Sequence, residues 1–225
     1  MEDIWQIGSF IIHKEWVAAG VSLLLAFGVL RYIGCFAKDD HRKKDVIGNM
    51  LFVFILVYQL SSFLFQTSLA FRYPISVLAS PGTWKEWTAG WIAAGIYLAV
   101  ASRSEKKLYF EAALYSVLIY ILTEFFFLSY QIYSQTASAA LVMHMTAAGL
   151  VFLAFLFLKN KLSYEYLLYI LLFFYGMVMS AYSFIFPAKA LFLYMPAWFF
   201  VCVASVGTAG FLSAWIRRGK AVDKK

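Results

Sequence analysis

Seven apolar stretches follow one another along the chain, separated by short charged or turn-forming breaks. They cover residues 16–36, 46–71, 88–102, 108–133, 139–158, 164–186 and 191–216. A helix of about 20 apolar residues crosses the hydrocarbon core of a bilayer, because lipid gives the backbone no other hydrogen-bond partner. We therefore predict an all-α, polytopic membrane protein with seven transmembrane helices. The third stretch is the weakest, since it is short and contains Gly90 and Gly95.

The composition of the 225-residue chain argues against a water-soluble fold. Hydrophobic residues make up 63% and charged residues only 14%, whereas soluble domains contain roughly 25% charged residues. A soluble fold of this size leaves about 30% of its surface in water, so it could not hide so many apolar side chains. This composition excludes a cytosolic enzyme, a nucleic-acid binder and a disordered protein.

The distribution of basic residues predicts how the chain lies in the membrane. All but four of the 19 Lys and Arg residues fall on one side, and the exceptions are Lys14, Arg72, Lys85 and Lys189. Basic loops stay in the cytoplasm, which places the N-terminus outside and the C-terminus inside. We expect an outer-surface arm at 1–15, the seven-helix domain at 16–216 and a basic cytoplasmic tail at 217–225. Glu2 and Asp3 argue against a cleavable signal peptide.

Ionisable side chains inside the apolar stretches are the first candidates for a functional site, because a charge at mid-helix costs roughly 2.5–3.5 kcal/mol in lipid. Glu111 and Glu165 lie about one turn from the inner ends, where we expect them to reach water. Glu124 lies about 16 residues beyond the inner end of the fourth stretch, or roughly 24 Å along the helix. His144 lies roughly 8 Å below the outer end of the fifth stretch. A short outer loop joins these stretches, so we expect Glu124 and His144 to share one depth.

This pair has two interpretations. A carboxylate that orients an imidazole can act as an acid–base pair near neutral pH, which makes His144 and Glu124 the candidate catalytic residues. The alternative is a structural hydrogen bond that relieves two polar groups in lipid. A metal site would need a third ligand, and no further His, Asp or Cys is placed for one. We therefore predict no metal and no cofactor.

A second polar group is expected near the outer ends of the second and fourth stretches. Arg72, Gln131 and Gln135 fall there, and Gln59 lies mid-span, where its amide must be satisfied inside the bundle. Arginine is suited to bidentate contact with phosphate, so we take Arg72, Gln59 and Gln135 as candidate residues for binding a lipid headgroup. The alternative for Arg72 is a side chain that extends along the interface into water.

Small residues recur at the four-residue spacing that lets helix backbones approach closely in lipid. The pairs are Ala18 and Ser22, Gly90 and Ala94, and Ser205 and Ala209, with Gly207 and Gly210 nearby. Packing within the bundle and a dimer face are both compatible with this pattern.

Several short motifs occur in a fixed order along nearly the whole chain. They are Ile7-Gly8-Ser9-Phe10 followed by Trp16, the charged segment from Asp39-Asp40 to Asp45, Tyr73-Pro74, Trp84, Gly90, His144-Met145-Thr146, Tyr169, Tyr175-Gly176 and the terminal Arg217-Arg218. This order resembles that of the prolipoprotein diacylglyceryl transferases, bacterial membrane enzymes that move a diacylglyceryl group from phosphatidylglycerol to a lipoprotein cysteine. The resemblance implies a fold in the plasma membrane, phosphatidylglycerol as donor and a lipoprotein as partner.

The chain departs from that family where the family has its catalytic groups. Thr88-Ala89-Gly90 stands where the family has histidine–glycine–glycine, and Gln59 stands near an expected arginine. The segment from Phe127 to Gln135 lacks the family's arginine, asparagine and glutamate, and Met179 and Ser183 replace another arginine and glutamate. The resemblance thus implies that the fold is kept and that most of the catalytic constellation is lost.

Three functions remain open from the sequence. The first is a lipid-handling transferase at the outer leaflet that uses His144, Glu124, Arg72 and Gln59. The second is a non-catalytic descendant that binds phospholipid, a lipoprotein or a membrane partner. The third is a small transporter, channel or receptor, which should show an inverted repeat or a polar path at the midplane. The sequence shows little midplane polarity and no repeat.

Overall fold

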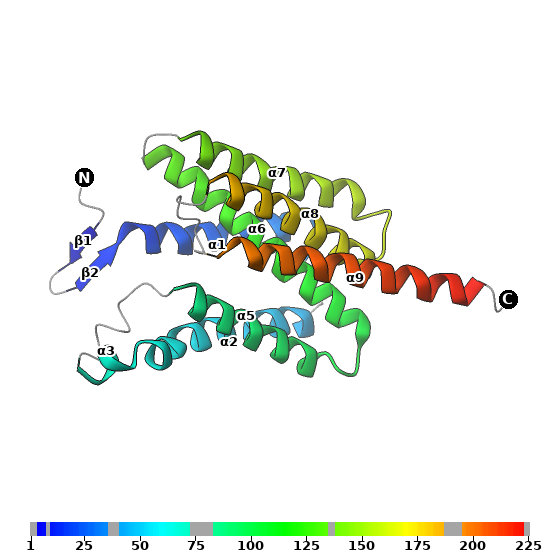
Figure 1. The fold of residues 1–225 in the computed structure, drawn as a ribbon, viewed down its shortest axis with the longest axis horizontal. Helices are drawn as coiled ribbons and strands as arrows, with labels where there is room; N and C mark the ends of the chain where they lie inside the picture. Colours follow the sequence, from blue (N-terminus) through cyan, green and yellow to red (C-terminus); the bar gives the residue numbers. More distant parts are fainter. Residues whose placement is uncertain are drawn as a thin grey trace.

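The computed structural model describes residues 4–7, 10–35, 41–72, 83–134, 138–186 and 195–222. Two short strands precede a helical bundle (Figure 1). The elements are β1 (Ile4–Ile7), β2 (Phe10–His13), α1 (Lys14–Tyr32), α2 (His41–Phe65), α3 (Thr67–Arg72), α5 (Trp84–Ala101), α6 (Lys106–Ser134), α7 (Ala139–Leu158), α8 (Tyr164–Ile185) and α9 (Ala197–Val222). The hairpin lies at one end of the molecule, and α9 projects from the other end toward the C-terminus (Figure 1).

Six of the described helices are long and apolar enough to cross a membrane, namely α1, α2, α6, α7, α8 and the Ala197–Arg218 part of α9. The chain is thus a helical, multi-pass type of membrane protein apart from its N-terminal hairpin. The predicted third span corresponds to α5, which is not among the six. Its 18 residues include Lys85 and Glu86 in the first turn, and these lower its apolar character.

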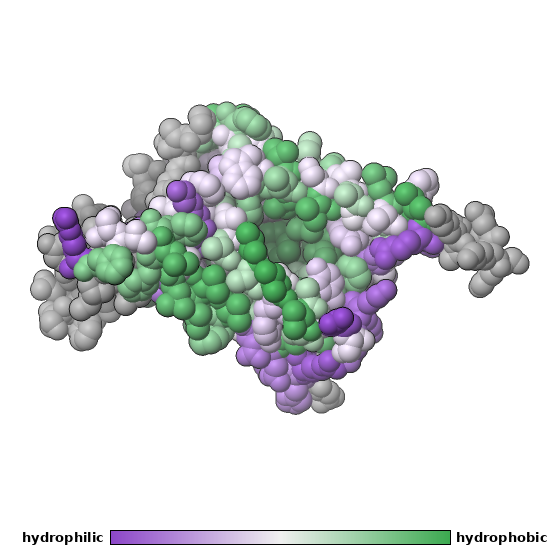
Figure 2. Space-filling model, turned by 60° about the horizontal axis from the view of Figure 1, so that its bottom comes forward, coloured by the Kyte–Doolittle hydropathy of each residue, from purple (hydrophilic) through white to green (hydrophobic). Residues whose placement is uncertain are grey.

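The surface of the bundle supports this class. Large apolar side chains are exposed along the helices, including Leu24, Phe52, Ile96, Phe157 and Trp215. Figure 2 shows apolar side chains over the middle of one face and hydrophilic ones gathered mainly toward its lower right. Apolar exposure on this scale is typical of a surface that meets lipid, because soluble monomers rarely present contiguous apolar patches above a few hundred Å².

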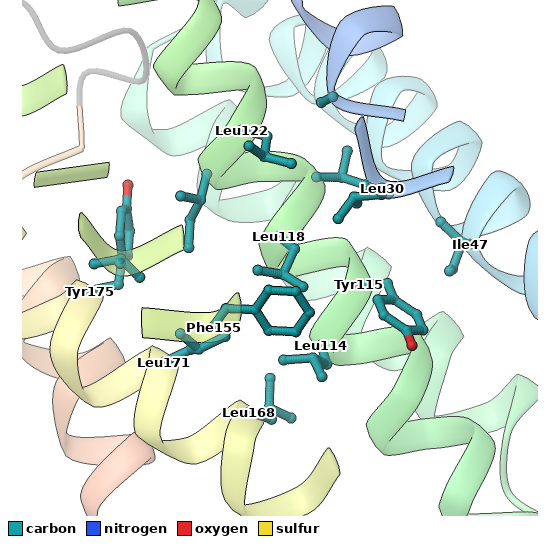
Figure 3. Close-up of a cluster of buried hydrophobic side chains, with 14 of the residues drawn as sticks. Leu30, Ile47, Leu114, Tyr115, Leu118, Leu122, Phe155, Leu168, Leu171 and Tyr175 are labelled. Carbon is teal, nitrogen blue, oxygen red and sulfur yellow. The ribbon is translucent and has the colours of Figure 1, made fainter. Parts of the chain in front are cut away.

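Helix α6 lies at the centre of the bundle. It contacts α1, α2, α5, α7 and α8, and 72% of its most apolar window is buried, against 17–39% for the other five spanning helices. Figure 3 shows Leu114, Leu118 and Leu122 of α6 between Leu30 of α1 and residues of α7 and α8. The five helices that contact α6 therefore pack around it, whereas α9 is placed through its contact with α8.

The two most extensive helix contacts are those of α8 with α9 and of α2 with α5. Gly176 and Gly207 allow α8 and α9 to touch through their backbones. A Cβ on Gly176 would lie 2.5 Å from the amide nitrogen of Ala204. In the second pair, a Cβ on Gly90 would lie 3.0 Å from the ring of Phe54. Close backbone approach at small residues is the usual means of helix association in lipid.

The three predicted pairs of small residues differ in how far they are buried. Ser22 is buried and donates a hydrogen bond to the Ala18 carbonyl at 2.7 Å, and Gly90 and Ala94 are both buried. Ser205 and Ala209, in contrast, are exposed. The contact of α9 with α8 instead runs through the intervening Gly207.

The N-terminal arm is a β-hairpin. Strands β1 and β2 pair antiparallel with Ile4 opposite His13 and Ile7 opposite Phe10. The sequence predicts an outer-surface arm at 1–15, and this hairpin lies within that range. The hairpin satisfies much of its own backbone hydrogen bonding by strand pairing, so a short apolar segment need not become a helix.

The start of α5 carries a capping box, which gives a first testable prediction. The Thr83 side chain accepts a hydrogen bond from the Lys85 amide, and the Thr83 amide donates to Glu86 at 2.8 Å. We expect Thr83→Ala to lower the free energy of unfolding by about 1 kcal/mol, since an orphan helix donor loses its partner. Ser163, at the N-cap of α8, makes no side-chain cap hydrogen bond.

Ser163→Ala is therefore the matched control, and its thermal midpoint in detergent should shift less than that of Thr83→Ala. Equal shifts in the two variants would show that the capping box does not stabilise α5.

Candidate functional site

Glu124 of α6 and His144 of α7 lie against each other in the interior of the bundle. The imidazole Nε2 is 2.9 Å from the Glu124 Oε1, and each side chain is only 1% exposed. The two helices pack along each other, and Ser138 caps the start of α7 through a hydrogen bond from the Leu141 amide. The structure thus brings together the two residues that the sequence placed at one depth.

Two tyrosines complete the surroundings of the carboxylate. Tyr175 of α8 donates a hydrogen bond to the Glu124 Oε2 at 2.7 Å. Tyr120, one turn before Glu124 on α6, lies 3.5 Å from Oε1 and 3.2 Å from the Tyr175 hydroxyl. We call Tyr120, Glu124, His144 and Tyr175 the buried polar cluster. Each Glu124 oxygen therefore has at least one partner, and together the partners come from three helices, α6, α7 and α8.

The contact of His144 with Glu124 is close but not well aligned. Nε2 lies within ion-pair distance of Oε1, yet its N–H makes no directed hydrogen bond to any described residue. The Tyr182 ring lies tilted by 40° against the imidazole, with ring centroids 4.9 Å apart, and it limits how the imidazole can move.

The buried polar cluster has the parts of an acid–base pair. The carboxylate can orient the imidazole and stabilise its protonated form, while the hydroxyl of Tyr175 holds the second carboxylate oxygen. Both side chains are closed from the surroundings, so a substrate reaches them only when neighbouring side chains move. Among the described residues, no group of three His, Cys, Asp or Glu side chains is arranged to hold a metal ion.

Two of the three candidate headgroup residues, Gln59 and Arg72, lie on α2 and α3, which contribute no residue to the buried polar cluster. Arg72 is the last residue of the short helix α3 and is exposed, and Gln59 is half-buried on α2. Neither is among the contacts of Glu124 and His144 in the described part of the chain. Gln135 lies outside the described residues.

A second buried charge cluster was not expected. The Lys43 ammonium of α2 lies 2.9 Å from a carboxylate oxygen of Glu111 on α6, with side chains only 7% and 10% exposed. The expectation that Glu111 reaches water was wrong. The charged first turn of α2 is helical, and it places Lys43 against the Glu111 carboxylate. The ammonium also lies 5.1 Å from the centroid of the Tyr115 ring. Glu165, by contrast, pairs with Arg217 at a more exposed position.

The two cysteines differ in their surroundings. Cys202 is exposed on α9, while Cys35, just after α1, is buried. Burial raises the pKa of the Cys35 thiol, although Lys159 and Lys43 act in the opposite direction. A raised pKa keeps this thiol protonated and poorly nucleophilic.

No family model matches the chain, and neither the curated proteins nor the solved structures contain a match to it. The likeness to a transferase family therefore depends on the order of sequence motifs alone. Any function has to be argued from the side chains that the fold brings together.

Proposed function

We propose that this protein is a multi-pass plasma-membrane protein of bacterial type that handles a phosphatidylglycerol-like lipid at the outer leaflet in lipoprotein biosynthesis. The proposal takes the prolipoprotein diacylglyceryl transferase family as its functional model, with chemistry that has diverged. The observation that carries the proposal is the 2.9 Å contact between His144 and Glu124 inside the buried polar cluster. Transfer to a cysteine thiol requires a base that takes the thiol proton, and we propose that this pair supplies it.

The proposal includes seven spans with the N-terminus outside. Arg42 pairs with Glu105, and Lys43 with Glu111, so α2 and α6 begin at the same basic end. Helix α5 packs along α2 and precedes α6, which supports a crossing back to this end. Its 18 residues extend about 27 Å, close to the roughly 30 Å hydrocarbon core. Basic residues at one end favour that end as cytoplasmic.

In the proposed reaction, His144 removes the proton from an acceptor cysteine, and Glu124 stabilises the imidazolium that forms. The thiolate then attacks the glyceryl carbon of phosphatidylglycerol that bears the phosphate. A carbon–sulfur bond forms, the carbon–oxygen bond to phosphate breaks, and glycerol phosphate leaves with the electron pair. Arg72 is the residue proposed to bind the phosphate, with Gln59 and Gln135 as further donors. Cationic stabilisation of the leaving group is the general requirement of such a transfer.

A second candidate is a non-catalytic protein that binds phospholipid, a lipoprotein or another membrane partner. The observation that favours it is the closure of the cluster, since Glu124 and His144 are both 1% exposed. In that case the cluster serves to fasten α6, α7 and α8 together.

The experiment that separates the two candidates is a transfer assay. The purified full chain is placed in vesicles that contain phosphatidylglycerol labelled in its acyl chains, together with a lipoprotein substrate that carries the acceptor cysteine. Under the transferase proposal, the wild type labels the substrate, and His144→Ala lowers the rate about 10²–10⁴-fold, as expected for loss of a general base.

Met143→Ala is the matched control, because Met143 is the exposed neighbour of His144 on α7, and it should keep the wild-type rate. A wild type that binds phosphatidylglycerol but never labels the substrate would overturn the transferase proposal in favour of the non-catalytic one.

A further inference from the structure

A small cavity opens between the end of α1 and the start of α2. It has a volume of about 240 Å³ and is lined by Phe27, Gly28, Arg31, Lys44, Ile47 and Gly48. We call it the α1–α2 notch. It lies at the basic end of the molecule, since it borders the first turn of α2, where Lys43 meets Glu111.

Two of the lining residues are glycines, Gly28 and Gly48. A Cβ built on Gly28 or on Gly48 would meet no heavy atom within 4 Å. The notch is therefore a space between two helices that do not pack extensively on each other, and the glycines leave it unfilled. A Cβ at Gly28 would extend into the notch without meeting a neighbour.

The lining combines cations with an apolar floor. Arg31 is exposed on the last turn of α1, and Lys44 is half-buried on the first turn of α2. Phe27 and Ile47 provide the floor, and Ile47 also faces the core of the bundle (Figure 3). Arginine and lysine side chains above apolar surface are suited to an anionic group that carries a hydrocarbon chain.

The apolar walls continue from the notch toward the middle of the spans. Leu24 lies one turn before Gly28 on the same face of α1 and is 72% exposed. Phe52 lies one turn after Gly48 on α2 and is 64% exposed. Because α1 ends at the notch and α2 begins there, both side chains lie on the hydrophobic side of the two cations.

We propose that the α1–α2 notch binds the headgroup of an anionic glycerophospholipid. The phosphate sits between Arg31 and Lys44, and an acyl chain lies along the surface of Leu24 and Phe52. A volume of about 240 Å³ is below the roughly 300–1,000 Å³ of pockets that enclose a drug-sized ligand. The notch therefore takes the phosphate and glycerol, while the chains remain in the bilayer.

This site is separate from the proposed reaction at the outer leaflet. It is built from α1 and α2 at the basic end and uses none of the residues of the buried polar cluster. Its lipid would hold together two helices that pack mainly on other partners, α1 on α6 and α2 on α5.

The test is native mass spectrometry of the full chain in detergent with added phosphatidylglycerol or phosphatidylcholine. We expect tighter retention of phosphatidylglycerol. Gly28→Leu places a side chain in the notch, and Arg31→Ala removes a cation that binds the phosphate. Each should weaken the binding of phosphatidylglycerol about tenfold or more. Gly20→Leu is the matched control, because Gly20 lies on the same helix with open space around it and does not line the notch.

Two further arms separate the alternatives. His144→Ala should retain the lipid as the wild type does, so loss of transfer and loss of notch binding are distinguishable. Glycerol 3-phosphate should not displace the lipid, because it lacks the acyl chain that contacts Leu24 and Phe52. Complete displacement by glycerol 3-phosphate, or unchanged retention in Gly28→Leu, would overturn the proposal.

Discussion

Gly207→Leu is expected to prevent recovery of a folded, monodisperse protein. A Cβ at residue 207 would lie 2.6 Å from the Phe173 amide nitrogen and 2.8 Å from the Tyr169 carbonyl oxygen. These are backbone atoms of α8, so they cannot rotate aside as a side chain would. The helices must separate, and the α8–α9 contact is one of the two most extensive in the bundle.

Gly207→Ala gives the graded version of this experiment. It should lower the free energy of unfolding by about 1–3 kcal/mol or more through overpacking. Gly95→Ala on α5 is the matched control, since nothing lies within 4 Å of a Cβ there. That control should be neutral or stabilising, because alanine favours a helix over glycine by roughly 0.5–1 kcal/mol. Thermal midpoints in detergent measure both, and a Gly207→Ala protein as stable as the wild type would contradict the backbone contact.

Lys43→Ala is expected to lower the free energy of unfolding by about 3–5 kcal/mol, the usual cost of leaving one member of a buried ion pair without its partner. The Glu111 carboxylate would remain buried with its counterion gone. Its other cation, Lys107, lies 3.7 Å away and is 81% exposed. Lys43 also connects α2 to the central helix α6, so the loss acts on a contact between distant parts of the chain.

Lys107→Ala provides a matched control on the same carboxylate. Exposed pairs contribute little because water screens them, so its midpoint should stay near that of the wild type. The double variant Lys43→Met with Glu111→Leu should recover much of the lost stability, because no lone charge remains buried. A double variant no better than Lys43→Ala would show that packing, rather than the unpaired carboxylate, explains the loss.

The helix boundaries could be predicted where hydropathy changes sharply. The expected stretches 139–158 and 164–186 agree with α7 and α8 to within one residue. Helix α2 instead begins at His41, five residues before the expected stretch, because its charged first turn stays helical. A helix can continue through polar residues beyond its apolar part when one of them has a partner, as Lys43 has in Glu111.

The rotation of each helix about its axis could not be predicted in the same way. In a bundle surrounded by lipid, both the buried face and the outer face are apolar, so the sequence lacks the polar stripe that marks the outside of a soluble helix. The contact of Glu124 with His144 could be predicted from their shared depth in the membrane. The position of Tyr120 beside Glu124 could be predicted from their four-residue spacing on one helix. Tyr175 was placed only by a motif, since its contact depends on how α8 is turned.

The central position of α6 has a consequence for how the protein is made. Helix α1 finds its main helical partner in α6, which the ribosome produces only after α2 and α5 have been synthesised. During synthesis, the first helices enter the membrane while their final packing surface is still missing. Assembly of the bundle must therefore wait until residues 106–134 have been inserted, and the insertion machinery has to hold or release the earlier helices without that support. Because of this order of synthesis, the insertion of α6 is the step at which the separate helices can pack into one bundle.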